Sequence, residues 1–221
     1  AASAGHQMTG NQMTGNQMTG KVLFQFPGQG SQAVGMGGAL ADAFPFARAV
    51  FDEVNDALGE DLFALMQSGP EEDLRLTRNA QPALFSASMA AVALLKDATG
   101  KPVHEMAQFV AGHSLGEYSA LAAAGTLAIG DAARLLRLRG DSMQGAVPPG
   151  DGAMAAILGT DEAIIDEIVV ESATEGVIQL ANDNAPGQTA VNGAATALDH
   201  AIAAAKPRGT LPALKLPVTA P

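Results

Sequence analysis

The sequence contains no cysteine and no tryptophan among its 221 residues. The absence of cysteine excludes disulfide bonds, thiolate zinc sites and a cysteine nucleophile, and it fits a cytoplasmic protein. Cationic side chains are scarce as well, with 12 Lys and Arg against 23 Asp and Glu. Proteins that bind nucleic acid usually carry a basic stripe, and the sequence has none. We therefore expect no nucleic-acid partner.

Long hydrophobic runs are also missing. No stretch reaches the ~18 consecutive apolar residues that a membrane span needs, so no membrane partner is expected. Residues 1–20 repeat NQMTG without apolar periodicity. This segment is interpreted as a tag rather than a signal peptide, because it has neither a basic start nor an apolar centre. The roughly 200 residues that follow suffice for one sizeable core, or for one domain with a smaller inserted lobe.

Short apolar strands alternate with helical patterns in the first part of this remainder, which favours an α/β architecture. Pro27 and Gly28 end the first strand, and Asp131 is the expected N-cap of the last helix. The expected strands are residues 22–26 and 109–111, and the expected helices are residues 39–58, 83–97, 115–124 and 132–144.

A cluster of proline and glycine at residues 148–152 separates this part from a βαββαβ pattern, which predicts a ferredoxin-like lobe. Its expected strands are residues 153–158, 177–182, 189–192 and 211–216, its helices are 161–170 and 194–205, and a turn lies at 185–187. The predicted organisation is residues 1–20 as tag, 21–147 as a large α/β lobe, 148–216 as the small lobe, and 217–221 as the return to the large lobe. Two strands are too few for a stable parallel sheet, so we expect more chain to complete the large lobe.

The stretch GHSLG places Ser114 between a predicted strand and a predicted helix. This G-x-S-x-G pattern is typical of a nucleophile elbow, in which a strained turn lifts the serine hydroxyl above the sheet. Gly112 and Gly116 leave room for the tight turn. The N–H of Leu115, at the helix start, is the natural first donor to an oxyanion. An ordinary glycine-bracketed turn is the simpler alternative.

A second donor is expected from a different loop. The segment PGQGSQ at residues 27–32 follows the first strand and would lie beside the elbow if the two strands are neighbours. It lacks the Gly-Lys-Ser/Thr ending of a phosphate-binding loop, so nucleotide binding is the weaker interpretation.

An arginine falls on the apolar face of the predicted helix 132–144. With Leu135 at zero and 100° per residue, Arg139 lies at about 40°, among the apolar side chains. Arg134 and Arg137 fall on the opposite side and are expected to be solvated. A buried guanidinium needs an anionic or hydrogen-bonding partner. Arg139 is therefore half of a structural ion pair, an arginine whose charged end reaches solvent past the end of the helix, or a clamp for a substrate carboxylate.

Five segments occur in one order: FPGQGSQ, GHSLGEYSALAAAG, LLRLRGDSMQ, GAMAAILG and ANDNAPGQTAVNG. Together they resemble the malonyl-CoA:acyl carrier protein transacylases of bacterial fatty acid synthesis, from about Val22 to Pro221. The related acyltransferase domains of polyketide synthases share the fold and several of these motifs.

The resemblance implies a hydrolase-like large lobe, a ferredoxin-like small lobe, and malonyl-CoA and acyl carrier protein as partners. Ser114 would form a malonyl ester, which the phosphopantetheine thiol of the carrier protein then attacks. The remaining positions that match family site residues are Gln29 and Leu115 for the oxyanion hole, Arg139 for the malonyl carboxylate, and Gln81 and Asn184 as polar groups around the site. No cofactor or metal is needed, because thioester-to-ester exchange is nearly isoergic. The location implied is cytoplasmic.

A serine near neutral pH needs a base, usually histidine. His6 lies in the repeat, His104 is expected at the surface, and His200 falls in the middle of a small-lobe helix. His113 adjoins Ser114, but neighbouring side chains diverge on a sharp elbow, so it is expected to support the elbow or line the pocket. The family's catalytic histidine follows a segment resembling LPVTAP. We therefore expect the base to lie beyond Pro221. We also expect the sequence to be an incomplete part of an active enzyme.

Three other functions are compatible with these motifs. A serine esterase would use the same elbow with water as acceptor and would not need Arg139. A polyketide-type acyltransferase would take a branched malonyl donor. A fragment that only binds acyl carrier protein would not react with malonyl-CoA. The candidate basic contacts to a carrier protein are Arg75, Arg78, Lys206 and Arg208, for each of which an ordinary solvated charge is the simpler interpretation.

Overall fold

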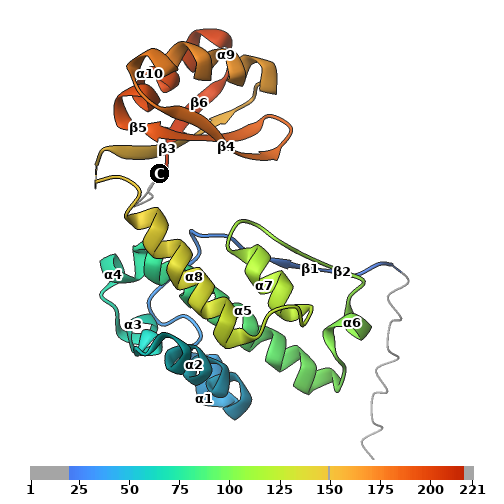
Figure 1. Ribbon diagram of the computed structural model, residues 1–221. Coiled ribbons are helices and arrows are strands. Elements are labelled where there is room, and N and C mark those ends of the chain that lie inside the picture. Colours follow the sequence, from blue (N-terminus) through green and yellow to red (C-terminus); the bar gives the residue numbers. More distant parts are fainter. Residues whose placement is uncertain (1–19, 149, 217–221) are drawn as a thin grey trace, which may run out of the picture.

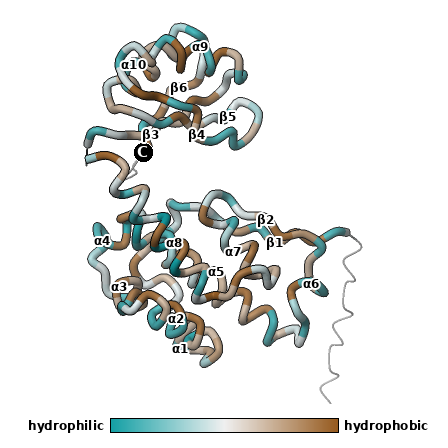
Figure 2. The backbone as a smooth tube through the Cα atoms, viewed as in Figure 1, coloured by the Kyte–Doolittle hydropathy of each residue, from teal (hydrophilic) through white to brown (hydrophobic). Residues whose placement is uncertain are grey.

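The computed structural model describes residues 20–148 and 150–216, which form two groups of elements joined after helix α8 (Figure 1). Each group has its own hydrophobic cluster, one around Phe51, Phe85 and Leu136 and the other around Ile157 and Leu198. Hydrophobic stretches accordingly run through both groups in Figure 2. Among the helices of the described residues, none is both long enough and apolar enough to cross a membrane.

The large lobe is built from two parallel strands and surrounding helices. Leu23 pairs with Phe109 at one end of the two-stranded sheet and Phe26 with Gly112 at the other. Both strands therefore deliver their carboxyl ends to the same edge, where the PGQGSQ loop and the elbow begin. The elements are β1 (Leu23–Phe26), α1 (Gly38–Ala43), α2 (Pro45–Leu58), α3 (Leu62–Ser68), α4 (Glu71–Arg75), α5 (Thr77–Thr99), α6 (Val103–Met106), β2 (Phe109–Gly112), α7 (Gly116–Ala123) and α8 (Ile129–Gln144).

The small lobe has the predicted βαββαβ order, and its neighbouring strands are antiparallel in the order β4-β5-β3-β6. In Figure 1 its α-helices cover one face of the sheet, and the other face lies toward the large lobe. Its elements are β3 (Gly152–Leu158), α9 (Glu162–Ser172), the 3-10 turn η1 (Ala173–Glu175), β4 (Ile178–Ala185), β5 (Gln188–Ala194), α10 (Ala195–Ala205), the 3-10 turn η2 (Lys206–Arg208) and β6 (Leu211–Lys215). The predicted α/β fold class is confirmed.

Several predicted boundaries were wrong. The expected helix over 39–58 is two helices, because Phe44 adopts an extended conformation before Pro45 starts α2. Helix α5 begins at Thr77 rather than near residue 83. Helix α8 begins at Ile129 with Ala128 as N-cap, so Asp131 lies in the first turn, where it pairs with Arg134 instead of capping the helix. The short helices α3, α4 and α6 were not predicted.

The predicted orientation of α8 was also wrong. Leu135 is 42% exposed and Leu138 is 64% exposed, whereas the fully buried residues are Ala132, Ala133, Leu136 and Gly140. The helix packs through its small residues against α5: a Cβ on Gly140 would lie 2.5 Å from the Cα of Arg78. Arg139 therefore lies on one flank of the buried face rather than at its centre. Arg137 lies on the other flank and is not solvated, since its side chain is only 12% exposed.

Candidate active site

Ser114 occupies a sharp turn between β2 and α7. Its φ of 54° makes it the only non-glycine residue with positive φ among the residues that the structure describes. This left-handed conformation is costly for an L-residue and persists where the surroundings enforce it. Here they do: His113 N–H donates to Phe26 O at 3.1 Å, and Gly116 N–H donates back to His113 O at 2.9 Å.

The glycines of the motif are required by close backbone approaches. A Cβ on Gly112 would collide with the backbone of Gly116, and a Cβ on Gly116 would lie 2.5 Å from Phe26 O. A Cβ on Gly28 would collide with the imidazole of His113. Gly116 therefore lets the turn approach the backbone at the end of β1, and Gly28 leaves room for the imidazole of His113.

The hydroxyl of Ser114 faces a cavity of about 280 Å³ between the two lobes. The large lobe contributes Gln29, Thr77, His113, Ser114, Arg139 and Met143 to its wall. The small lobe contributes Met154, Ala181, Asn182, Asn184, Ala190, Asn192 and Leu216. A larger, more open hollow lies on the small lobe, near the start of α9, but no serine or histidine lines it.

Arg139 reaches Ser114 directly. Its Nη2 donates to Ser114 Oγ at 3.0 Å, and its Nη1 donates to Gln81 Oε1 at 2.6 Å. Gln81 is fully buried, so this hydrogen bond fixes one edge of the guanidinium. No carboxylate of the described residues forms a salt bridge with Arg139, which leaves the charge of its guanidinium at the cavity without an anionic partner. The ion-pair alternative for Arg139 is thus absent from this geometry.

Two backbone N–H groups lie at the ends of β1 and β2. The N–H of Gln29, in the loop after β1, and the N–H of Leu115, at the N-cap of α7, have no acceptor among the described residues. Leu115 is 1% exposed. Donors that are held in place and left without an acceptor are what an oxyanion site requires.

His113 makes no hydrogen bond to Ser114 Oγ, although both residues line the cavity. Its Nε2 is 2.9 Å from Asn184 Oδ1, a contact that joins the large lobe to β4 of the small lobe. His104 is exposed in α6, and His200 Nδ1 contacts Ser172 Oγ inside the small lobe. Among the described residues, Arg139 is the single side chain hydrogen-bonded to Ser114 Oγ, and none of the described histidines reaches it.

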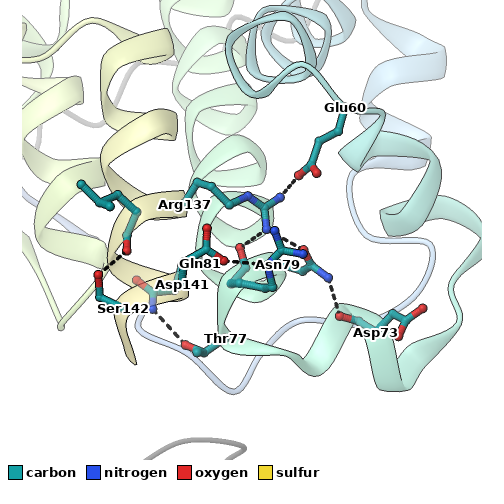
Figure 3. A network of polar contacts seen from close by, with 10 residues as sticks. Glu60, Asp73, Thr77, Asn79, Gln81, Arg137, Asp141 and Ser142 are labelled. Carbon is teal, nitrogen blue, oxygen red and sulfur yellow. Dashed lines mark hydrogen bonds and ion pairs between the residues drawn. The ribbon is translucent and has the colours of Figure 1, made fainter. Parts of the chain in front are cut away.

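Arg137 belongs to a separate network beside the site (Figure 3). Its guanidinium pairs with Glu60 and donates to Arg78 O at 2.6 Å and to Asn79 Oδ1 at 2.7 Å. Pro82 has no N–H, so the helical hydrogen bond to Arg78 O is missing and Arg137 takes its place. Burial lowers the pKa of Arg137 below the usual arginine value, while the carboxylate of Asp141 acts in the opposite direction.

Sequence reasoning missed three contributors to the site. Thr77 donates to Gln29 Oε1, Met143 Sδ accepts from Gln81 Nε2, and Asn192 lines the cavity. The spacing of Thr77 and Gln81 by four residues on one helix was a usable signal, because such residues share a helix face. The candidate cations for a carrier protein are largely paired internally: Arg75 with Glu71, Arg78 with Asp141, and Arg208 with Glu171.

The two-lobed α/β fold, with a serine turn hydrogen-bonded to an arginine beside the cavity, has the outline of an acyl transferase domain. The acyl transferase domain family matches residues 23–216, and the chain belongs to this family.

The curated relatives include the malonyl CoA-acyl carrier protein transacylases of Escherichia coli K12 and Bacillus subtilis. The first is 48% identical over 198 residues and the second 45% identical over 202 residues, covering 90% and 91% of this chain. The chain spans 63% and 62% of the length of these two relatives.

Solved structures agree with this assignment. The acyl-carrier-protein-S-malonyltransferase of Bartonella henselae is 50% identical, with a TM-score of 0.85 over 91% of this chain and 64% of its own. A malonyl-transacylase solved in complex with its type II PKS acyl-carrier protein is 44% identical, with a TM-score of 0.84 over the same shares.

Proposed function

We propose that the protein transfers a malonyl group from malonyl-CoA to the phosphopantetheine thiol of an acyl carrier protein. The observation that carries the proposal is the guanidinium of Arg139, 3.0 Å from Ser114 Oγ and without a carboxylate partner. A cation held at this distance suits an acyl donor with a free carboxylate. The names of the curated relatives, which are malonyl CoA-acyl carrier protein transacylases, support the same donor and acceptor.

In the first step Ser114 Oγ attacks the thioester carbonyl carbon and loses its proton to a base. The C–S bond breaks, CoA leaves as its thiol, and the malonyl group stays on Ser114 as an ester. The N–H groups of Gln29 and Leu115 stabilise the oxyanion of the tetrahedral intermediate. In the second step the carrier-protein thiol attacks the ester carbonyl, and the serine hydroxyl is restored.

Arg139 has two partners in this scheme. In the free protein its Nη2 rests on Ser114 Oγ, and on binding it turns to the malonyl carboxylate as a bidentate donor. Gln81 keeps hold of Nη1 throughout, so the guanidinium moves little. None of the described histidines is hydrogen-bonded to Ser114 Oγ, so the scheme assigns the base to none of them.

The small lobe covers the ester. Met154, Ala190 and Leu216 present apolar surface to the cavity, and Asn184 links this wall to His113. An ester between two successive thiol exchanges must be kept from water, and a second lobe over the serine provides that cover. A cytoplasmic location, compatible with the absence of cysteine, is part of the same proposal.

The test is a transfer assay with malonyl-CoA or acetyl-CoA and the phosphopantetheine form of an acyl carrier protein. We expect malonyl transfer in the unaltered protein and none in Ser114→Ala. Arg139→Ala is expected to lower malonyl transfer by at least ~100-fold while acetyl transfer is kept or rises, because a site built for a charged group rejects its analogue strongly. Undiminished hydrolysis of uncharged esters by Arg139→Ala, with no transfer by the parent, would establish the esterase instead.

A further inference from the structure

A continuous chain of hydrogen bonds connects the loop after β1 to the hydroxyl of Ser114. Thr77 Oγ1 donates to Gln29 Oε1 at 2.9 Å and accepts from Gln81 Nε2 at 2.9 Å. Gln81 Oε1 then accepts from Arg139 Nη1, and Arg139 Nη2 donates to Ser114 Oγ. Thr77 links the two glutamines of this chain. It is the first residue of α5 and is 2% exposed.

Counting donors and acceptors shows why a hydroxyl is needed at this position. A hydroxyl has one proton to donate and lone pairs to accept with. Because the Thr77 hydroxyl donates its proton to Gln29 Oε1, it can only accept a hydrogen bond from Gln81. The donor of that hydrogen bond is the NH₂ group of Gln81 (Figure 3). The amide of Gln81 is thereby oriented with its carbonyl oxygen toward Arg139. That oxygen is the acceptor which holds the guanidinium.

We infer that Thr77 is a positioning residue. It fixes both Arg139, the proposed clamp for the carboxylate of the acyl group, and the loop that carries the N–H of Gln29. The inference rests on the proposed function and deepens it: Thr77 touches none of the reacting atoms and acts through Gln81 on Arg139 and through the Gln29 side chain on the loop. It makes the selection of a carboxylate-bearing acyl group depend on a buried hydroxyl in α5.

Without the hydroxyl the side chain of Gln81 is held mainly by its hydrogen bond from Arg139. The other recorded partner of its NH₂ group is Met143 Sδ at 3.3 Å, and a thioether is a weak acceptor. The amide of Gln81 then loses its strong hydrogen bond on the side away from Arg139, so the oxygen that holds the guanidinium is no longer fixed in place. Arg139 loses its fixed edge, and the geometry for a bidentate carboxylate contact is lost.

The experiment measures the rate constants for acylation of Ser114 by malonyl-CoA and by acetyl-CoA, followed by intact mass. Thr77→Val is expected to lower the malonyl-to-acetyl ratio about tenfold, because a hydrogen bond that orients a charged group is lost. Acetyl acylation should fall only severalfold, through the loop. Thr77→Ser keeps the hydroxyl and should stay within about twofold of the parent for both donors. Ser86→Ala, which removes another buried hydroxyl of α5 outside this network, should change neither rate.

An Arg139→Ala background separates positioning from general damage. If Thr77 acts through Arg139, adding Thr77→Val to Arg139→Ala leaves the ratio unchanged. The inference would be overturned if Thr77→Val kept the malonyl-to-acetyl ratio of the parent, or if Thr77→Ser were as impaired as Thr77→Val. Thr77→Ala is the second variant without a hydroxyl, for use if Thr77→Val does not fold. A parent protein without preference for malonyl-CoA would instead count against the proposed function, so the two failures are distinct.

Discussion

Ser114, the proposed nucleophile, has a strained backbone conformation. Its φ of 54° is imposed by the turn between β2 and α7, in which neighbouring backbones leave no room for side chains at Gly112 and Gly116. A left-handed conformation costs an L-residue roughly 1–2 kcal/mol, and glycine avoids that cost. A serine at this turn therefore lowers the stability of the fold relative to a glycine, a cost that is common at functional sites.

Two variants isolate this strain. Ser114→Ala and Ser114→Gly both remove the hydroxyl and its contact with Arg139, and they differ only in the Cβ. We expect Ser114→Gly to have the higher free energy of unfolding, by about 1 kcal/mol, because glycine tolerates positive φ. Urea denaturation of the two variants measures the difference. Equal stabilities, or a more stable Ser114→Ala, would mean that the turn is not strained.

The packing of helix α8 against helix α5 brings Arg139 to the site. Gly140 allows α8 to lie against the start of α5, and Pro82 leaves Arg78 O without its helical partner. Arg137 supplies that partner and also binds Glu60 and Asn79. Arg139 and Arg137 thus leave the same helix on two flanks, one to the cavity and one to a structural network.

The link between Pro82 and Arg137 predicts non-additive stabilities. Arg137→Met should lower the free energy of unfolding by about 2 kcal/mol, because Arg78 O and Asn79 lose a charged donor. Pro82→Ala gives Arg78 O a backbone N–H donor again. Its effect on the free energy of unfolding should therefore be more favourable by about 1 kcal/mol in the Arg137→Met background than in the parent.

The control for this cycle is Arg134→Met, on the exposed side of the same helix. Arg134 forms a surface pair with Asp131, for which a change below about 0.5 kcal/mol is expected. Strictly additive effects of Arg137→Met and Pro82→Ala in chemical denaturation would rule out the replacement of the missing helical bond by Arg137.

These helices also show what the sequence could and could not predict. Local signals were sufficient for the strand–turn–helix at Ser114 and for the βαββαβ lobe, because turn chemistry and periodicity are read from neighbouring residues. The predicted place of Arg139 at the centre of an apolar face was wrong. The prediction that Arg137 is solvated was wrong, because the helix packs through Ala and Gly residues. The predicted buried face had instead been centred on Leu135 and Leu138, which are exposed. The partner of Arg137 depends on Pro82, some 55 residues earlier in the chain, and no local pattern reveals such a pairing.

At the scale of the whole molecule, the cavity exists because the two lobes face each other. The large lobe provides Ser114, Arg139 and the proposed oxyanion donors, which are the N–H groups of Gln29 and Leu115. The small lobe provides the apolar cover and the contact from Asn184 to His113. His113, which adjoins Ser114 in the sequence, thus contacts Asn184 of the small lobe and makes no hydrogen bond to Ser114 Oγ in this geometry.

The account as a whole depends on Ser114 carrying a malonyl ester. The most direct measurement is intact mass and peptide mapping of the protein after brief mixing with malonyl-CoA, with Ser114→Ala as the control. We predict one malonyl adduct on the peptide that contains Ser114, none on Ser114→Ala, and little labelling from acetyl-CoA. An adduct on another residue, or equal labelling of Ser114 by both donors, would contradict the account.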